Sequence, residues 1–226
     1  MGPGDIASCT GPQGDRAQAA RIVSAHGDPP PTEAVSLAVE ALRGGAIVGL
    51  PTDTIYGLAV DPFSAGASAR LFDLKGRPRS VGFPVLVADE DQALALCATV
   101  TAAARSLMTR FWPGPLTLVL ARRPGLNFDL GSARSTIGVR CPAHPLPLAI
   151  CRELGPIATT SANRHGGVAL TTASSVAASL GTGVAMVLDA GRCDAKASSV
   201  VDCTGSAPKL LREGPVSAAD VAGTVA

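Results

Sequence analysis

The stretch AIVGLPTDTIYGL, from Ala46 to Leu58, decides the interpretation of this sequence. Its first five residues are apolar or small and lie between Gly44-Gly45 and Pro51, which is the pattern of a short buried strand. Directly afterwards come two threonines, a carboxylate and the only tyrosine of the chain. Open α/β sheets bind ligands at the carboxyl ends of their strands. We therefore expect a binding site at this strand end, rather than only a capped turn.

The composition is that of a globular protein without a broad charged face. Of the 226 residues, 46% are hydrophobic, which is ample for a packed core. Only 16% are charged and the formal net charge is +1. A protein that grips nucleic acid by itself needs a basic surface, so this class is disfavoured.

The six cysteines favour a reducing compartment. They are scattered, with no CxxC pair and no matching pair of histidines, which favours neither a zinc site nor a disulfide framework. No apolar run is long enough to span a membrane, and the amino terminus lacks the features of a signal peptide. We expect no protein-held metal, no membrane contact and a cytoplasmic location. The cysteines are Cys9, Cys97, Cys141, Cys151, Cys193 and Cys203.

Residues 1–31 are expected to form a mobile arm. They are rich in Gly, Pro, Ala and Ser, end in three prolines and have no apolar period with which to dock. From residue 32 onward, predicted helices and strands alternate with no internal repeat and no linker. The predicted fold class is therefore α/β, with residues 32–226 forming one domain whose large twisted, mostly buried sheet is flanked by helices.

Apolar periodicity and turn residues set the expected elements. Helices are expected over residues 32–43, with Thr32 as the N-cap, over residues 68–74, 89–97, 101–111 and 148–154, and from Ser217 onward. A further helix is expected to end at Leu180, with Thr171 or Thr172 as its N-cap. Strands are expected over residues 46–50, 84–88, 116–120, 135–141, 157–160, 184–189, 198–202 and 208–212.

Three cations follow the second predicted helix. Pro78 disfavours a helical backbone at the preceding residue, so the segment is expected to be extended, with Lys75, Arg77 and Arg79 on one side. The negative end of a helix accounts for one cation but not for three. A phosphate group accounts for all of them, because Lys and Arg are the usual partners of phosphate oxygens.

Further polar residues stand at other predicted strands. Residues 159–167, TTSANRHGG, combine hydroxyls, an amide and glycines, a composition suited to binding an anion or a nucleotide through backbone N–H groups. Thr117 is the one hydroxyl residue in its apolar strand, so it needs a partner in the backbone or in a substrate. Arg140, near a strand end, could pair with a surface carboxylate or reach into the site.

Taken in order, these motifs resemble the YrdC-like family of threonylcarbamoyl-adenylate synthases over about residues 33–218. The family implies a nucleotidyltransferase that combines ATP, bicarbonate or CO2, and L-threonine into threonylcarbamoyl-AMP and pyrophosphate. Other proteins then transfer the threonylcarbamoyl group to a tRNA adenosine. The matching motifs are PTDTIYGL, KGRP followed by PVLV, WPGPLTLVL, the strand ending at Arg140, ATTSAN followed by glycines, SSVVD and LREG.

The resemblance also implies roles for individual residues. Thr54, Thr117 and Ser198 are expected to contact threonine, and Arg140 is a further candidate on either side of the site. ATP is a substrate, and Mg2+ is expected to arrive with its triphosphate. The expected partners are the small substrates and the transferases that use the product, with tRNA contact weak or indirect. The expected catalytic residues are Lys75 and Arg77, and the expected nucleotide and phosphate contacts are Lys75, Arg77, Ser161, Asn163 and Arg212.

Departures from the family pattern leave alternatives open. Val81-Gly82-Phe83 stand where the family has a polar residue and Pro-Leu, and Arg164-His165-Gly166 stand where it has Ser-Gly. These changes leave room for a carbamoyl-adenylate-forming enzyme that acts on another amine, or for a nucleotide- or RNA-binding module of the same fold. A serine hydrolase that uses Ser161 with His165 or His144 is disfavoured, because no G-x-S-x-G turn precedes the serine.

Overall fold

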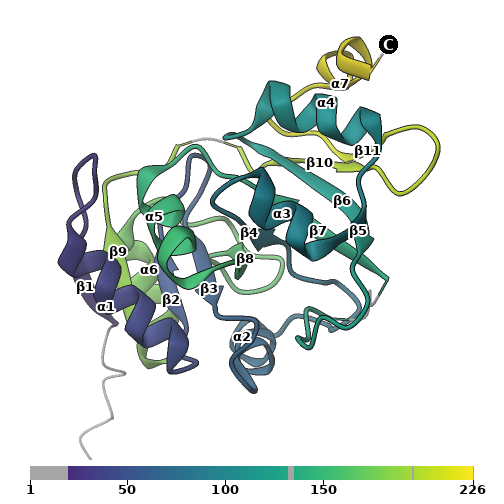
Figure 1. Cartoon of the computed structure of the whole chain (residues 1–226). Helices are drawn as coiled ribbons and strands as arrows, with labels where there is room; N and C mark the ends of the chain where they lie inside the picture. Colours follow the sequence, from purple (N-terminus) through teal and green to yellow (C-terminus); the bar gives the residue numbers. More distant parts are fainter. Residues whose placement is uncertain (1–19, 132–134, 195, 226) are drawn as a thin grey trace, which may run out of the picture.

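One eleven-stranded sheet runs through the protein (Figure 1). The computed structural model describes residues 20–131, 135–194 and 196–225. The strand order is β1-β9-β2-β3-β8-β4-β7-β6-β10-β11, with β5 beside β6. The strands are β1 (Arg21–Ser24), β2 (Val48–Leu50), β3 (Gly57–Val60), β4 (Val85–Leu86), β5 (Cys97–Thr99), β6 (Leu116–Arg122), β7 (Thr136–Arg140), β8 (Ile157–Ser161), β9 (Met186–Asp189), β10 (Ser199–Asp202) and β11 (Lys209–Arg212).

Helices cover both faces of this sheet, so the predicted α/β class is confirmed (Figure 1). Successive residues of a strand point to opposite faces, and in β3 Leu58 and Val60 join one core cluster while Ala59 joins the other. The helices are α1 (Thr32–Arg43), α2 (Ala67–Lys75), α3 (Glu90–Leu96), α4 (Ala102–Phe111), α5 (Pro145–Leu154), α6 (Ala173–Leu180) and α7 (Ala218–Val225), with a 3-10 turn at Gly181–Gly183.

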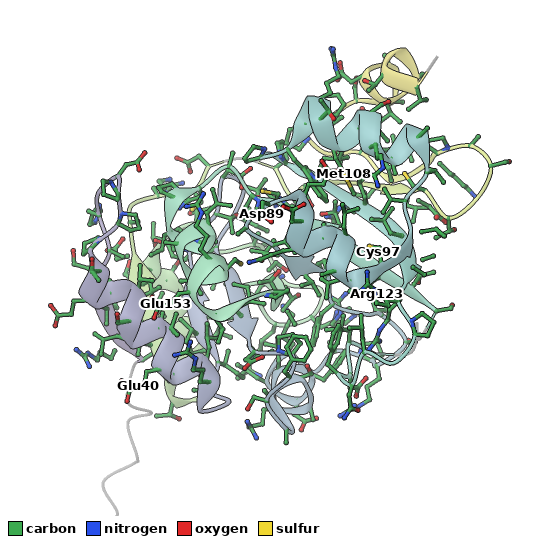
Figure 2. The ribbon with its side chains drawn as sticks, in the orientation of Figure 1. Glu40, Asp89, Cys97, Met108, Arg123 and Glu153 are labelled. Atoms are coloured by element: carbon green, nitrogen blue, oxygen red, sulfur yellow. The ribbon has the colours of Figure 1, made fainter. Side chains whose placement is uncertain are left out.

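The two core clusters lie under different helices. One cluster takes the buried faces of α1 and α5, whose outer sides carry Glu40 and Glu153 (Figure 2). The other takes the buried faces of the remaining α-helices and includes Cys97 after α3 and Met108 on α4 (Figure 2). Both clusters are apolar, so burial of this surface is the main stabilising contribution.

Helix starts follow the sequence closely, with one exception. Thr101 and Asp89 accept backbone N–H bonds at the starts of α4 and α3, and Thr172 forms a reciprocal capping box at the start of α6. Thr32 is not an N-cap, because it is already the first helical residue and the preceding Pro31 carbonyl accepts the bond from Val35 N.

The predicted arm over residues 1–31 is wrong for its last third. β1 lies in it and pairs in parallel with β9, and Ala25, just after the strand, is buried and donates to Asp189 O at 2.7 Å. Residues 1–19 lie outside the described residues. β3 and β5 were also not predicted, because both are short and β3 begins at a glycine.

Three smaller points concern excluded classes. None of the helices in the described ranges is long and apolar enough to cross a membrane. Five cysteines are buried and unpaired, while Cys9 lies outside those ranges. The same ranges hold no group of three or more His, Cys, Asp or Glu side chains that could hold a metal ion.

Candidate active site

A cavity of about 250 Å³ lies against the central strands of the sheet. Eight of the nine predicted site residues line it, and Lys75 is the ninth. A larger hollow of about 510 Å³ lies between residues 62–69 and 122–131, and none of the predicted residues lines it. We therefore identify the smaller cavity as the candidate site. The eight residues are Thr54, Arg77, Thr117, Arg140, Ser161, Asn163, Ser198 and Arg212.

The site lies across a face of the sheet and not at one strand end. β8 runs antiparallel to β3 and β4, whereas β4 and β7 run parallel. The carboxyl end of β8, at Ser161, and the carboxyl end of β7, at Arg140, therefore lie at opposite ends of the strands. The loop after β2 begins at the same end of the strands as Ser161. It then crosses the face of the sheet, so that Thr54 contacts Arg140. The cavity therefore includes the loop after β2 that was expected to form the site, and it extends from there across the sheet to Ser161 and Arg140.

Thr52 and Arg140 fix the shape of the loop that carries Thr54. Thr52 Oγ1 accepts from Thr54 N at 3.1 Å and from Ile55 N at 3.2 Å, and lies 2.9 Å from Thr54 Oγ1. Arg140 donates from Nη1 to Thr54 Oγ1 at 3.0 Å, from Nη2 to Asp53 Oδ1 at 2.6 Å and from Nε to the carbonyl of Gly114. Arg140 therefore reaches into the site.

Two buried hydroxyls form a pair on the far side of the cavity. Thr117 Oγ1 on β6 lies 2.9 Å from Ser198 Oγ, which stands directly before β10. Arg212 on β11 donates to the Ser198 carbonyl from Nε at 2.9 Å and from Nη2 at 2.8 Å. The partner that Thr117 required is thus a second hydroxyl, and a substrate that enters the cavity meets both of them.

The unusual segment Val81-Gly82-Phe83 holds Arg77. Arg77 donates from Nε to Val81 O at 2.8 Å, from Nη2 to Gly82 O at 3.0 Å and from Nη1 to Thr160 Oγ1 at 3.4 Å. Its guanidinium carbon lies 5.3 Å from the centre of the Phe83 ring. A guanidinium has five N–H groups, so these three bonds leave two without a partner among the described residues.

Arg79 does not join the other two cations, so that part of the loop prediction is wrong. Lys75 is still helical, and Gly76 then adopts the left-handed conformation, with φ of 60° and ψ of 33°, which redirects the chain. Arg79 points elsewhere and pairs with Asp129 at 2.6 Å, where both side chains are about half exposed.

Lys75 is buried and donates hydrogen bonds to the loop that contains Ser161 and Asn163. It is 2% exposed, and its Nζ donates to Ser161 O at 2.6 Å, to Asn163 O and to Asn163 Oδ1 at 3.1 Å. Ser161 Oγ donates to Asn163 Oδ1 at 2.6 Å. The serine hydroxyl therefore contacts an amide oxygen, which adds to the reasons against a serine hydrolase.

The site carries an excess of positive charge. Burial lowers the pKa of Arg77 and of Arg212, and each is lowered further by a neighbouring arginine: Arg77 by Arg212, and Arg212 by Arg140. Burial also lowers the pKa of Arg140, which Asp53 partly offsets. Asp53 pairs with Arg140, and its Oδ2 has no partner among the described residues.

Several lining residues lie in the segments expected to form the site but were given no individual role from the sequence. Thr159 and Thr160 of β8 are buried and line the cavity, as does Thr52. Hydroxyl residues in an otherwise apolar strand are the same signal that pointed to Thr117, and it was available for the two threonines of β8 as well. Tyr56 also lines the cavity and donates to Gly191 O at 2.7 Å, which joins the loop after β2 to the loop after β9.

Comparison with known proteins places the chain among relatives of one kind. The family model Sua5_yciO_yrdC, described as telomere recombination, matches residues 40–214. One relative is a protein of Mycobacterium tuberculosis (strain H37Rv) that is provisionally named threonylcarbamoyl-AMP synthase. It is 41% identical over 186 residues, which are 82% of this chain and 86% of that protein. Threonylcarbamoyl-AMP synthase of Bacillus subtilis is 37% identical over 185 residues, 80% of this chain and 54% of the relative.

Solved structures give the same result. Sua5 of P. abyssi in complex with L-threonine superposes with a TM-score of 0.84 at 32% identity, over 90% of this chain and 61% of that one. YciO of E. coli superposes with a TM-score of 0.78 at 25% identity, over 88% of this chain and 96% of that one. The chain thus spans nearly the whole of a compact relative and a little over half of the longer ones, and the predicted fold is confirmed.

Proposed function

The chain belongs to the Sua5, YciO and YrdC family, and from this membership we propose that it makes L-threonylcarbamoyl-AMP. It is a nucleotidyltransferase. The amino group of L-threonine adds to CO2 and loses a proton, which gives a carbamate. A carbamate oxygen then bonds to the α-phosphorus of ATP while the bond to the bridging oxygen breaks, so pyrophosphate leaves. Other proteins use the product to modify tRNA.

The observation that carries this proposal is the charge of the cavity. Arg77, Arg140 and Arg212 converge on it, each with a lowered pKa, and Asp53 compensates one of them. Cations that repel one another are stabilised when an anion enters, and a triphosphate supplies several negative charges. Fixed positive charge is also what a phosphoryl-transfer transition state requires.

The nucleotide side is formed by Arg77, Arg212, Ser161 and Asn163. The two remaining N–H groups of Arg77 suit a phosphate, because a guanidinium fork matches two phosphate oxygens. Both Nη1 hydrogens of Arg212 likewise make no contact within the described ranges. The roles of these residues are positioning and charge stabilisation, and no side-chain nucleophile takes part.

The threonine side is formed by Thr54, Thr117, Ser198 and Arg140. The carboxylate of the amino acid suits Arg140, and its hydroxyl suits the pair of Thr117 and Ser198, whose oxygens lie 2.9 Å apart. Thr54 is bonded to Arg140 and so lies between the two sides. The P. abyssi relative forms a complex with L-threonine, which supports the same amino acid as the substrate here.

Mg2+ fits this site only as a companion of the triphosphate. Asp53 Oδ1 accepts from the lining residue Arg140 at 2.6 Å, and the described residues hold no group of three or more His, Cys, Asp or Glu side chains that could bind a metal ion. Mg2+ carried on ATP would neutralise part of the phosphate charge when bound. The positioning of the substrates described above is carried out by side chains of the protein.

Product analysis tests the proposal. The protein is incubated with ATP, bicarbonate and one amine at a time: L-threonine, L-serine, L-valine or ammonia. We expect pyrophosphate release that depends on L-threonine and bicarbonate, and a product with the mass of threonylcarbamoyl-AMP. A product formed only with another amine would contradict the choice of threonine. Tight RNA binding without pyrophosphate release would instead support a binding module.

A further inference from the structure

Lys75 has no N–H group left for a phosphate. An ammonium group has three N–H donors. In this structure each has an acceptor: the carbonyl of Ser161, the carbonyl of Asn163 and the side-chain oxygen of Asn163. Lys75 is 2% exposed, and it is not among the described residues that line the cavity. Arg77, two positions later, lines the cavity and keeps unused N–H groups.

The bonds of Lys75 hold one loop, residues 161–167. Besides the contacts from Nζ, the carbonyl of Lys75 accepts from His165 N at 2.9 Å, so the residue grips the loop at two places. Asn163 carries the contact onward, because its Nδ2 donates to the carbonyl of Gly167. Ser161, Asn163 and Gly167 all line the cavity. The shape of this wall of the cavity therefore depends on Lys75.

The environment of the ammonium is made of neutral oxygens. Its three acceptors are carbonyl and amide oxygens, and the charged group that acts on it most is the guanidinium of Arg77. His165 contributes only its main-chain N–H to this contact. Burial first, and Arg77 second, lower the pKa of Lys75 to about 8.

We propose that Lys75 is a positioning residue: it holds the 161–167 loop in the shape that faces the nucleotide phosphates, and it does not contact the triphosphate itself. The proposal rests on the proposed function for the identity of the nucleotide. The grip on the loop is a property of the protein without ligand. It can therefore be tested when no ATP is present.

Amide hydrogen exchange of the nucleotide-free protein separates the two roles. We expect Lys75→Met to speed exchange of the amides in residues 162–167 by at least roughly tenfold, because three carbonyl and amide acceptors lose their donor and the loop opens locally. Amides of α1 and β6 should exchange as in the wild type. Arg77→Ala should weaken ATP binding and leave exchange of the loop unchanged. Arg79→Ala, a cation of the same segment that pairs with Asp129, should change neither.

Wild-type exchange of the loop in Lys75→Met, together with a loss of ATP affinity as large as in Arg77→Ala, would overturn the proposal and make Lys75 a direct phosphate ligand. If Lys75→Met does not fold, Asn163→Ala removes one acceptor of the same ammonium and should also speed exchange of residues 162–167. Unchanged exchange in that variant would also contradict the proposal that Lys75 holds the 161–167 loop. Absence of threonylcarbamoyl-AMP synthesis would refute the proposed function but not this result, because exchange is measured without ATP.

Discussion

The Nη2 atom of Arg140 lies 2.6 Å from Oδ1 of Asp53, with side-chain exposures of 7% and 12%. A second arginine–aspartate pair, Arg79 and Asp129, has the same distance but exposures of 52% and 55%. The two pairs have the same chemistry at different burial, so their stabilising effects can be compared directly. A buried pair that loses one partner leaves an uncompensated charge, whereas an exposed pair is screened by water.

We expect Asp53→Asn to lower the free energy of unfolding by about 3 kcal/mol, because Arg140 would remain buried without its carboxylate. Asp129→Asn is the matched control and should change the free energy of unfolding by less than about 1 kcal/mol. Urea unfolding of both variants at neutral pH measures the difference. Equal losses would show that burial does not distinguish the two pairs.

Arg77→Ala and Lys75→Ala should each lower the rate of adenylate formation by at least roughly tenfold, about 1.4 kcal/mol of transition-state stabilisation. Arg77 supplies positive charge to the cavity, and Lys75 holds the 161–167 loop in shape. Pyrophosphate release at saturating threonine measures both effects, and circular dichroism checks that the fold is kept. Arg79→Ala serves as the control with an unchanged rate. Wild-type turnover in both variants would contradict the proposed roles of Arg77 and Lys75 in nucleotide binding.

The activity should decline on the alkaline side, because the loop needs the protonated form of Lys75. Burial and Arg77 lower its pKa from 10.5 to about 8, so kcat/KM for ATP should fall as the pH rises through about 8. The contribution of Lys75 to folding stability changes in the opposite direction with pH. Between about pH 8 and pH 10.5 the unfolded chain holds this proton and the folded chain does not, so the contribution of Lys75 to stability increases with pH.

A pH profile of kcat/KM from about pH 6.5 to pH 9.5 checks this expectation. Lys75→Met should have a lower activity at neutral pH and no decline near pH 8, because the titrating group is gone. A decline of the same size in that variant would assign the pH dependence to another group.

Amino-acid selectivity should follow the hydroxyl pair of Thr117 and Ser198. We expect L-threonine to be preferred, L-serine to be a poorer substrate, and L-valine or 2-aminobutyrate to be rejected by roughly a hundredfold or more in kcat/KM, because neither can make the hydrogen bond that the threonine hydroxyl would make to this pair. Thr117→Val should reduce this discrimination. Competition between threonine and valine measures it, and equal turnover of the two by the wild type would contradict a pocket that binds the hydroxyl.

Deletion of residues 1–28 tests the role of β1. A mobile arm could be removed without effect, but β1 pairs with β9 and the deletion would expose that strand as a new edge. We expect the melting temperature to fall by several degrees, which corresponds to about 1–2 kcal/mol in a domain of this size. Removal of residues 1–19 alone leaves β1 in place and is the matched comparison. An unchanged melting temperature after the longer deletion would mean that β1 adds no stability.

Local patterns predicted most elements, because caps and apolar periods act over a few residues. Thr101, Asp89 and Thr172 stand at helix starts in the structure as their residue types indicate. Strand β1 could not be found in this way, because its four residues are too few to show an alternation of apolar and polar side chains. Its stability comes from β9, which lies far away in the sequence.

The members of the site could be predicted better than their arrangement. Arg77 and Arg79 have the same residue type and almost the same position, yet one lines the cavity and the other pairs with Asp129. The left-handed turn at Gly76 and the carbonyls of Val81 and Gly82 decide between them, and neither is visible as a pattern of residue types. The contact of Thr54, in the loop after β2, with Arg140, at the end of β7, likewise joins segments far apart in the sequence.

The cavity is lined both by Thr54, from the loop after the second strand, and by Arg212, from the last strand. During synthesis on the ribosome, a nascent chain that has emerged as far as α5 already contains the PTDT loop and Arg140. It does not yet contain Ser198 or Arg212, and β6 still lacks its neighbour β10. Non-local contacts of this kind form late in folding. Ligands should therefore not bind the growing chain, and their binding would report that the whole sheet has been completed.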